Sequence, residues 1–394
     1  MRRFLVIISL QAYAVLLALY QGLASVRTDE AKYLLDIPYP HPPLMRVLMH
    51  VTEQFPLQEF FWRITLATLM VQSVWIVVSL VKKWAPEKRL TLCGLWLFSS
   101  AILFQAGSIM MAPITALQGL LFVWILLRKG DQKAYQGKAG WVALLWLGSL
   151  FTAYQSVLYG PIVLAIFIRR RVHFLHTIVA IGVPIVLVAM YIAVNPLAAA
   201  SLINAGGQNI HMPFLDTAQL VLGSWLWSGS VVLSLLGLVG MIRAKQWALL
   251  GSTALVFGFL FTSYRPYYAV LFLPLLVGGV LVTPSVLKRS ATLLALQIVV
   301  MVWIFAHTQL SFYPSPARTV MQQLNQLPHD GVVLVSGTFG HQWQYESSSP
   351  LYRYSAVLLS KAKAVVCLDS CPGVRLYGFY PIENTATEVW VRQQ

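Results

Sequence analysis

Long apolar runs recur along this chain, and basic residues gather in every second gap between them. A run of about 20 apolar residues is enough for a helix to cross the hydrocarbon core of a bilayer. Only 10% of the residues are charged, whereas soluble domains carry about 25%. The pattern predicts an all-α polytopic membrane protein with about eleven spans. The apolar runs cover residues 4–25, 61–81, 90–108, 112–127, 141–154, 156–168, 177–194, 219–242, 247–263, 268–283 and 291–307.

The basic residues also predict how the chain is oriented. Cytoplasmic loops of membrane proteins carry an excess of Lys and Arg. The N-terminus is therefore expected in the cytoplasm and the C-terminus outside, in a bacterial inner membrane or a plasma membrane. Membrane topology accounts for the net charge of +15, so no nucleic-acid partner is expected. The residues that share this side are Arg2, Arg3, Lys82, Lys83, Lys88, Arg89, Arg128, Lys129, Lys133, Lys138, Arg169, Arg170, Arg171, Arg243, Lys245, Lys288 and Arg289.

The character of the sequence changes after the last apolar run. We expect a transmembrane domain over residues 1–307 and a small extracytoplasmic α/β domain over 308–394. Within the second domain, Cys367 and Cys371 form the motif CLDSC and can close a small disulfide loop in an oxidising compartment. The expected elements there are a helix at 317–327, a strand in DGVVLVSG, a helix at 350–363, and strands in AVVCL and TEVWVRQ.

Three external loops, 26–60, 195–218 and 262–268, open on the same side of the membrane and predict a cavity there. The first contains TDEAKYLLDIPYPHPPL, in which Asp29 and Glu30 follow the first span closely. A carboxylate beside hydrocarbon is poorly hydrated, which suits a general base. The prolines that follow fix the backbone φ and make the segment a rigid strap.

Basic side chains on the outer side have no role in topology, so an anionic ligand explains them better. Arg265 is the clearest case, because arginine binds phosphate through a planar fork of donors. We predict a site in which a hydroxyl attacks, a carboxylate takes its proton and cations neutralise a departing lipid phosphate. The candidate phosphate ligands are Arg265, Lys32, Arg46, Arg63 and Tyr264, and the candidate cavity residues are Tyr33, His41, His211 and Tyr267.

No cofactor is expected. The external carboxylates leave a divalent metal open, although no ligand spacing in the sequence supports one. These carboxylates are Asp29, Glu30, Asp36 and Asp216.

Four segments together resemble a known family of membrane enzymes. They are DEAKY at 29–33, HPPL at 41–44, EFFWR at 59–63 and SYRPYYAVLFLPLL at 263–276. These segments and their order along the chain resemble those of the polyprenyl-phosphate-sugar-dependent glycosyltransferases of the GT-C superfamily. The most similar branch contains protein O-mannosyltransferases and the lipid A aminoarabinose transferase.

The resemblance implies a GT-C fold with Asp29 as catalytic base and Glu30 as a neighbouring site residue. Arg265 and nearby cations would contact the lipid phosphate. The donor would be an undecaprenyl- or dolichyl-phosphate sugar, transferred with inversion to an extracytoplasmic lipid, glycan or protein.

Two segments depart from the family pattern. The stretch IMMAPITAL at 109–117 has no carboxylate where many relatives carry an aspartate, and Ala153 stands where many carry a lysine. These departures leave open an enzyme with another acceptor or a catalytically silent assembly partner. A lipid or sugar transporter is a further alternative, although the spans are almost free of charge and show no repeat.

Overall fold

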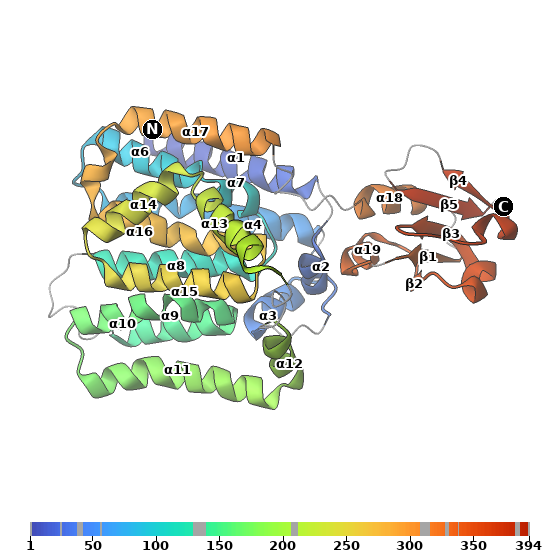
Figure 1. Ribbon diagram of the computed structural model, residues 1–394, viewed down its shortest axis with the longest axis horizontal. Coiled ribbons are helices and arrows are strands. Elements are labelled where there is room, and N and C mark those ends of the chain that lie inside the picture. Colours follow the sequence, from blue (N-terminus) through green and yellow to red (C-terminus); the bar gives the residue numbers. More distant parts are fainter. Residues whose placement is uncertain are drawn as a thin grey trace. The chain divides into compact units, whose positions relative to one another are not determined.

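The structure is a computed structural model that describes residues 2–23, 26–37, 42–55, 57–128, 139–205, 212–307, 316–327, 331–337, 339–382 and 387–392. The chain divides into two compact units (Figure 1). The helical unit comprises Met1–Leu19 and Tyr39–Ser311, and the sheet unit comprises Tyr20–Pro38 and Phe312–Gln394. The sheet unit thus includes part of the first external loop as well as C-terminal residues, and the expected boundary between residues 307 and 308 stays a prediction.

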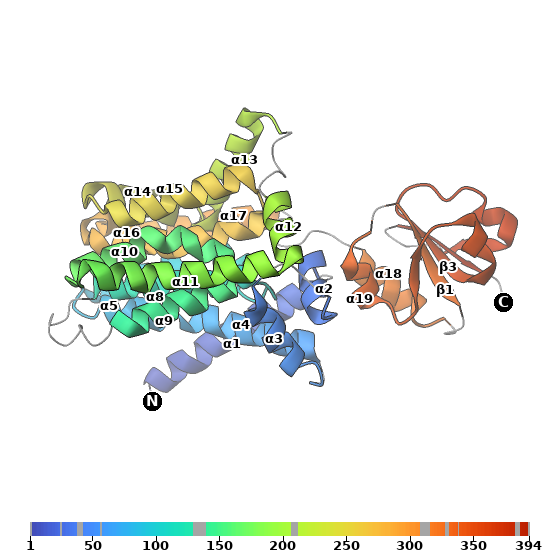
Figure 2. The same ribbon diagram turned by 90° about the horizontal axis from the view of Figure 1, so that it is seen from below.

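Apolar helices build the helical unit. In its interior α8 lies beside α16, which packs closely on α14 (Figure 1). Along one side α11 runs next to α9 (Figure 2). The elements are α1 (Arg2–Gly22, whose last turn enters the sheet unit), α3 (Pro43–Val51), α4 (Gln58–Gln72), α5 (Val74–Leu80), α6 (Pro86–Leu97), α7 (Ser100–Gln105), α8 (Met111–Leu127), α9 (Ala139–Thr152), η2 (Tyr154–Tyr159), α10 (Gly160–Arg169), α11 (Phe174–Val194), α12 (Pro196–Ala205), α13 (Phe214–Ser228), α14 (Val232–Arg243), α15 (Trp247–Thr262), η3 (Pro266–Phe272), α16 (Leu273–Val282), η4 (Pro284–Leu287) and α17 (Ser290–His307).

Four helical segments within the described residues are long and apolar enough to cross a membrane, and a bent pair makes a fifth candidate. The expected total of about eleven stays a prediction, since the other apolar helices are shorter. The four segments are Phe4–Gly22, Gln58–Leu80, Phe174–Val194 and Ser290–His307. The shorter apolar helices are Met111–Leu127, Gly140–Thr152, Tyr154–Arg169, Trp247–Thr262 and Pro266–Val282.

The apolar run at 219–242 was expected to be one continuous span. Instead α13 and α14 meet at an angle of 95°. Ser230 and Val231 both have positive φ at the break. The Ser230 hydroxyl lies 2.7 Å from that of Ser100, so a partner more than a hundred residues away stabilises the bend.

A mixed five-stranded sheet forms the centre of the sheet unit, with strand order β2-β1-β3-β5-β4. The first three strands run parallel, and β5 pairs antiparallel with both β3 and β4. The elements are α2 (Thr28–Leu34), α18 (Ala317–Leu324), β1 (Val332–Ser336), α19 (His341–Glu346), β2 (Leu351–Arg353), η5 (Ala356–Lys361), β3 (Ala362–Cys367), η6 (Val374–Tyr377), β4 (Phe379–Ile382) and β5 (Glu388–Arg392).

Alternate residues of each central strand face opposite sides of this sheet. Val333 and Val335 pack with Trp343 of α19 and the apolar face of α18. Leu334, between them in the strand, packs on the other side with Leu359 of η5. Because both faces are covered, the central strands are buried on both sides.

The predicted strands in DGVVLVSG, AVVCL and TEVWVRQ are confirmed as β1, β3 and β5. The helix expected at 350–363 is wrong. Its first part is strand β2, which pairs parallel with β1, and only 356–361 form a short 3₁₀ helix. Pairing with β1 overrides the local helical preference.

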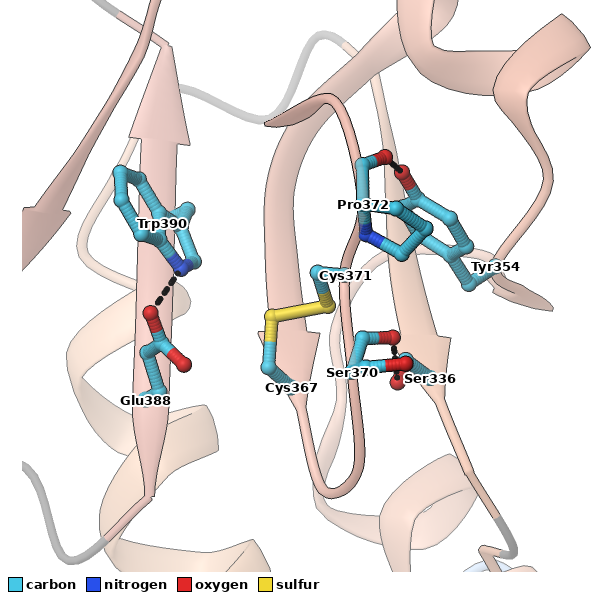
Figure 3. Close-up of a disulfide and its surroundings, with 8 residues drawn as sticks. All are labelled: Ser336, Tyr354, Cys367, Ser370, Cys371, Pro372, Glu388 and Trp390. Carbon is cyan, nitrogen blue, oxygen red and sulfur yellow. Dashed lines mark hydrogen bonds between the residues drawn. A yellow bond between two sulfur atoms is a disulfide. The ribbon is translucent and has the colours of Figure 1, made fainter. Parts of the chain in front are cut away.

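A disulfide joins Cys367 to Cys371 at the end of β3 (Figure 3). The loop that it closes is tied to neighbouring elements. Ser336 at the end of β1 donates to the Ser370 carbonyl over 2.7 Å, and the Tyr354 hydroxyl donates to the Pro372 carbonyl over 2.5 Å. The disulfide that the sequence allowed is therefore present.

Candidate functional site

The candidate base Asp29 lies in the first turn of α2, in the sheet unit. Its Oδ1 is 3.2 Å from Nζ of Lys32, one turn further along the same helix. The side chains of Asp29 and Lys32 are 22% and 21% exposed. A carboxylate near a helix N-terminus and a cation near its C-terminus both agree with the helix dipole. Asp29 is thus ordered and charge-balanced, yet reachable from outside.

Glu30 has a different environment from its neighbour. It is only 2% exposed, and its Oε2 accepts a 2.8 Å hydrogen bond from the backbone N–H of Arg27. That N–H precedes the helix, where no backbone carbonyl of the helix can accept it, and the Glu30 side chain accepts it instead. Glu30 therefore stabilises the start of α2, and it fixes the turn on which Asp29 stands.

Tyr33 completes the group of candidate residues on α2 and is 3% exposed. The structure therefore brings Asp29, Glu30, Lys32 and Tyr33 together on a single short helix.

Arg63 lies in the helical unit, on α4, and is almost completely buried. Its Nε is 2.8 Å from Oε1 of Glu59, and its Nη1 donates to the Gly107 carbonyl over 3.2 Å. Gly107 belongs to the connection between α7 and α8. Arg63 thus links α4 to that connection, and its charge is balanced by Glu59.

Arg265 begins the second cluster of candidate residues in the helical unit. It is partly buried at the start of η3, and its Nη1 donates to the Tyr264 carbonyl over 3.1 Å. The Tyr264 hydroxyl lies 2.7 Å from the Ser224 hydroxyl of α13. The rings of Tyr267 and Tyr268 are 4.5 Å apart. The residues that the sequence placed in one Tyr-rich turn therefore do form one ordered turn.

Two glutamines that the sequence analysis did not single out hold this turn. Gln155 Nε2 of η2 donates to the Tyr268 hydroxyl over 2.9 Å, and Gln105 Nε2 of α7 donates to the Pro266 carbonyl over 3.3 Å. Gln155 stands in FTAYQSVLY, two residues after Ala153. Its position in that segment is the signal that could have identified it.

Arg46 is partly buried on α3. His41 and His211 lie outside the described residues. Within the described part of the chain, no group of three or more His, Cys, Asp and Glu side chains could hold a metal ion.

No protein-family model matches this sequence, and no curated protein matches it. Solved structures do match this chain. ArnT from Cupriavidus metallidurans bound to undecaprenyl phosphate superimposes with a TM-score of 0.64 and 12% identity, over 98% of this chain and 97% of that one. The same protein in the apo state superimposes with a TM-score of 0.62 and 14% identity, over 99% and 98% of the two chains. Because the match covers nearly the whole chain, it includes the sheet unit as well as the helices. The chain therefore has the fold of ArnT, in agreement with the fold that the sequence resemblance implied.

Proposed function

We propose that this protein is an integral-membrane glycosyltransferase that moves a sugar from a polyprenyl phosphate to an acceptor hydroxyl at the outer membrane face. The observation that carries the proposal is the fold shared along nearly the whole chain with ArnT, one of whose structures holds undecaprenyl phosphate. The apolar helices agree with a lipid-borne donor. The acceptor is a lipid, a glycan or a protein.

In this proposal Asp29 is the general base. It takes the proton of the acceptor hydroxyl while the acceptor oxygen bonds to the anomeric carbon of the sugar. The bond from that carbon to the phosphate oxygen breaks, and the electron pair leaves with the polyprenyl phosphate. A single displacement of this kind inverts the anomeric centre. The partial exposure of Asp29 and the charge balance from Lys32 support the assignment.

Glu30 is the weaker candidate for the reacting carboxylate. It is buried and accepts the Arg27 N–H, so in the proposal it holds the first turn of α2 and thereby Asp29.

The departing phosphate needs cations and hydrogen-bond donors. Arg265 is our first candidate, because it is partly buried in an ordered turn, where its guanidinium donates to the Tyr264 carbonyl. Lys32 and Arg46 are further candidates. Arg63 is less suited, since Glu59 already balances its charge.

The test uses the full-length protein in lipid nanodiscs with a panel of polyprenyl-phosphate sugars. Release of polyprenyl phosphate is measured by mass spectrometry. We expect release with at least one donor, and its loss in Asp29→Asn without a change in the thermal midpoint. Glu53→Gln is the control, because its side chain is 60% exposed and paired only with an exposed histidine in the described contacts. Full activity of Asp29→Asn would disprove the base assignment.

One observation favours the second candidate, a catalytically silent assembly partner. Ala153, at the position where relatives carry lysine, is 1% exposed at the break between α9 and η2. No charge can be supplied from there. Binding of polyprenyl phosphate without release from any donor in the panel would support the silent partner over the enzyme.

A further inference from the structure

Helix α2, which carries Asp29, packs against α19 from the C-terminal part of the chain. The two helices belong to the same compact unit although more than 300 residues separate them in sequence. Helix α2 has seven residues, and isolated helices shorter than about 12 residues are marginal in water. Its conformation and place therefore depend on what it packs against.

A hydrogen bond in this packing joins Thr28 to Gln342. The Thr28 hydroxyl donates to the Gln342 amide oxygen over 2.5 Å. Thr28 is the first residue of α2 and directly precedes Asp29. The contact therefore holds the turn on which the proposed base stands.

Gly340, just before α19, shows how close the approach is. A Cβ at this position would lie 2.3 Å from the Gln342 amide oxygen, 2.5 Å from the Thr28 hydroxyl oxygen and 3.1 Å from the Thr28 methyl carbon. The backbone of Gly340 is extended, with φ at −100°, so any residue could adopt its conformation. The glycine is needed there for space alone.

Arg318 of α18 makes a second link to the segment that enters α2. Its Nε and Nη2 both lie 2.9 Å from Oε1 of Glu346 at the end of α19. Its Nη1 donates to the carbonyl of Gly22, the last residue of α1. The Arg318 and Glu346 side chains are only 17% and 10% exposed. One guanidinium therefore ties α19 to the chain just ahead of α2.

Helix α19 is itself firmly held. Trp343, the neighbour of Gln342, is 2% exposed within the core between the sheet and α18. Asn325 Nδ2 donates to the Glu346 carbonyl over 2.9 Å. The platform that contacts Thr28 is thus anchored to the sheet.

We propose that the sheet unit positions Asp29 for transfer, with Gln342 and Arg318 as the positioning residues that hold α2 through Thr28 and Gly22. The inference rests on the proposed function and adds a role for the C-terminal residues. Small displacements of a reacting group lower turnover strongly, because geometry sets the barrier. Donor binding does not require the same alignment.

The first measurement needs no activity. Hydrogen–deuterium exchange of the α2 amides is followed in the full-length protein in nanodiscs for Gln342→Ala and Thr28→Val. Gln344→Ala is the matched control, since Gln344 lies on the same helix and is exposed. We expect faster exchange of α2 in both test variants and no change in the control. Unchanged exchange in both would disprove the docking role.

The second measurement is the rate of transfer. We expect kcat to fall about tenfold or more in Gln342→Ala, with the KM for the donor unchanged. The double variant with Thr28→Val should be no slower than either single one, because both remove the same contact. Gln342→Glu keeps an acceptor oxygen and should retain most of the rate.

Two results separate the possible failures. If the wild-type protein transfers no sugar from any donor, the proposed function fails, while the exchange data still decide whether α19 holds α2. If exchange rises throughout the sheet unit and activity falls only with the folded fraction, the contacts are merely structural and the positioning role is overturned.

Discussion

Arg63 and Glu59 form an ion pair that is almost removed from water. The atoms Nε and Oε1 are 2.8 Å apart, and the side chains are 3% and 17% exposed. The residues are one turn apart on α4, and Arg63 also donates to the Gly107 carbonyl. The pair therefore stabilises the buried Arg63 cation inside the helical unit. Through the Gly107 carbonyl, Arg63 also connects α4 to the segment between α7 and α8.

Glu59→Gln should destabilise the helical unit, because it removes the negative charge that lies 2.8 Å from Nε of the buried Arg63. Breaking a buried pair by removing one partner costs about 3–5 kcal/mol. The thermal midpoint in detergent measures the loss, with Glu53→Gln as the exposed control. In the double variant Glu59→Gln with Arg63→Met, part of the lost thermal midpoint should be recovered. Equal midpoints for Glu59→Gln and the control would show that the pair contributes nothing.

Arg265→Ala should weaken binding of polyprenyl phosphate to the purified protein. A hydrogen bond to a charged group contributes about 1.5–3 kcal/mol, which corresponds to about 10- to 150-fold in affinity. Arg265→Lys keeps the positive charge but loses the planar fork of donors. Its affinity for polyprenyl phosphate should therefore lie between those of the wild type and of Arg265→Ala. Titration calorimetry in nanodiscs gives the affinities. Arg243→Ala, exposed at the end of α14, is the control. An unchanged affinity in Arg265→Ala would remove Arg265 from the phosphate site.

Gly279→Ala should destabilise the packing of α14 on α16. A Cβ at Gly279 would overlap the backbone of Gly237, so the helices would have to separate. Small residues allow such close approach of membrane helices, and overpacking costs about 1–3 kcal/mol. In α15, Gly258 has nothing within 4 Å of an added Cβ. Gly258→Ala should therefore keep or raise the thermal midpoint, whereas a drop of equal size in both variants would contradict the prediction.

The Cys367–Cys371 disulfide should stabilise the sheet unit modestly. The loop spans a sequence separation of only four residues, and the chain-entropy relation gives about 2 kcal/mol for a loop this short. Replacing both cysteines by serine should speed trypsin cleavage after Lys363 in β3 and after Arg375 in η6, the basic residues on either side of the loop. Dithiothreitol should have the same effect on the wild-type protein and none on the double variant. Resistance to trypsin in the reduced wild type would show that the hydrogen bonds around the loop suffice (Figure 3).

The sequence predicted those helices that a continuous run of apolar residues specifies by itself. The apolar runs at 4–25, 177–194 and 291–307 appear as α1, α11 and α17. Hydropathy carries no information on direction, so the 95° bend between α13 and α14 was not predicted. That bend is tied to Ser100 through Ser230.

The same distinction holds for the candidate site. TDEAKYL marks its own helix start, since Glu30 reaches back to the Arg27 N–H and Lys32 pairs with Asp29. These interactions span three residues, so the sequence alone determined that the two carboxylates stand on one ordered turn. Which part of the molecule holds that turn was decided only by the tertiary structure. The contact between Thr28 and Gln342 joins residues more than 300 positions apart in the sequence, so it depends on the packing of α19 against the sheet and not on a local pattern.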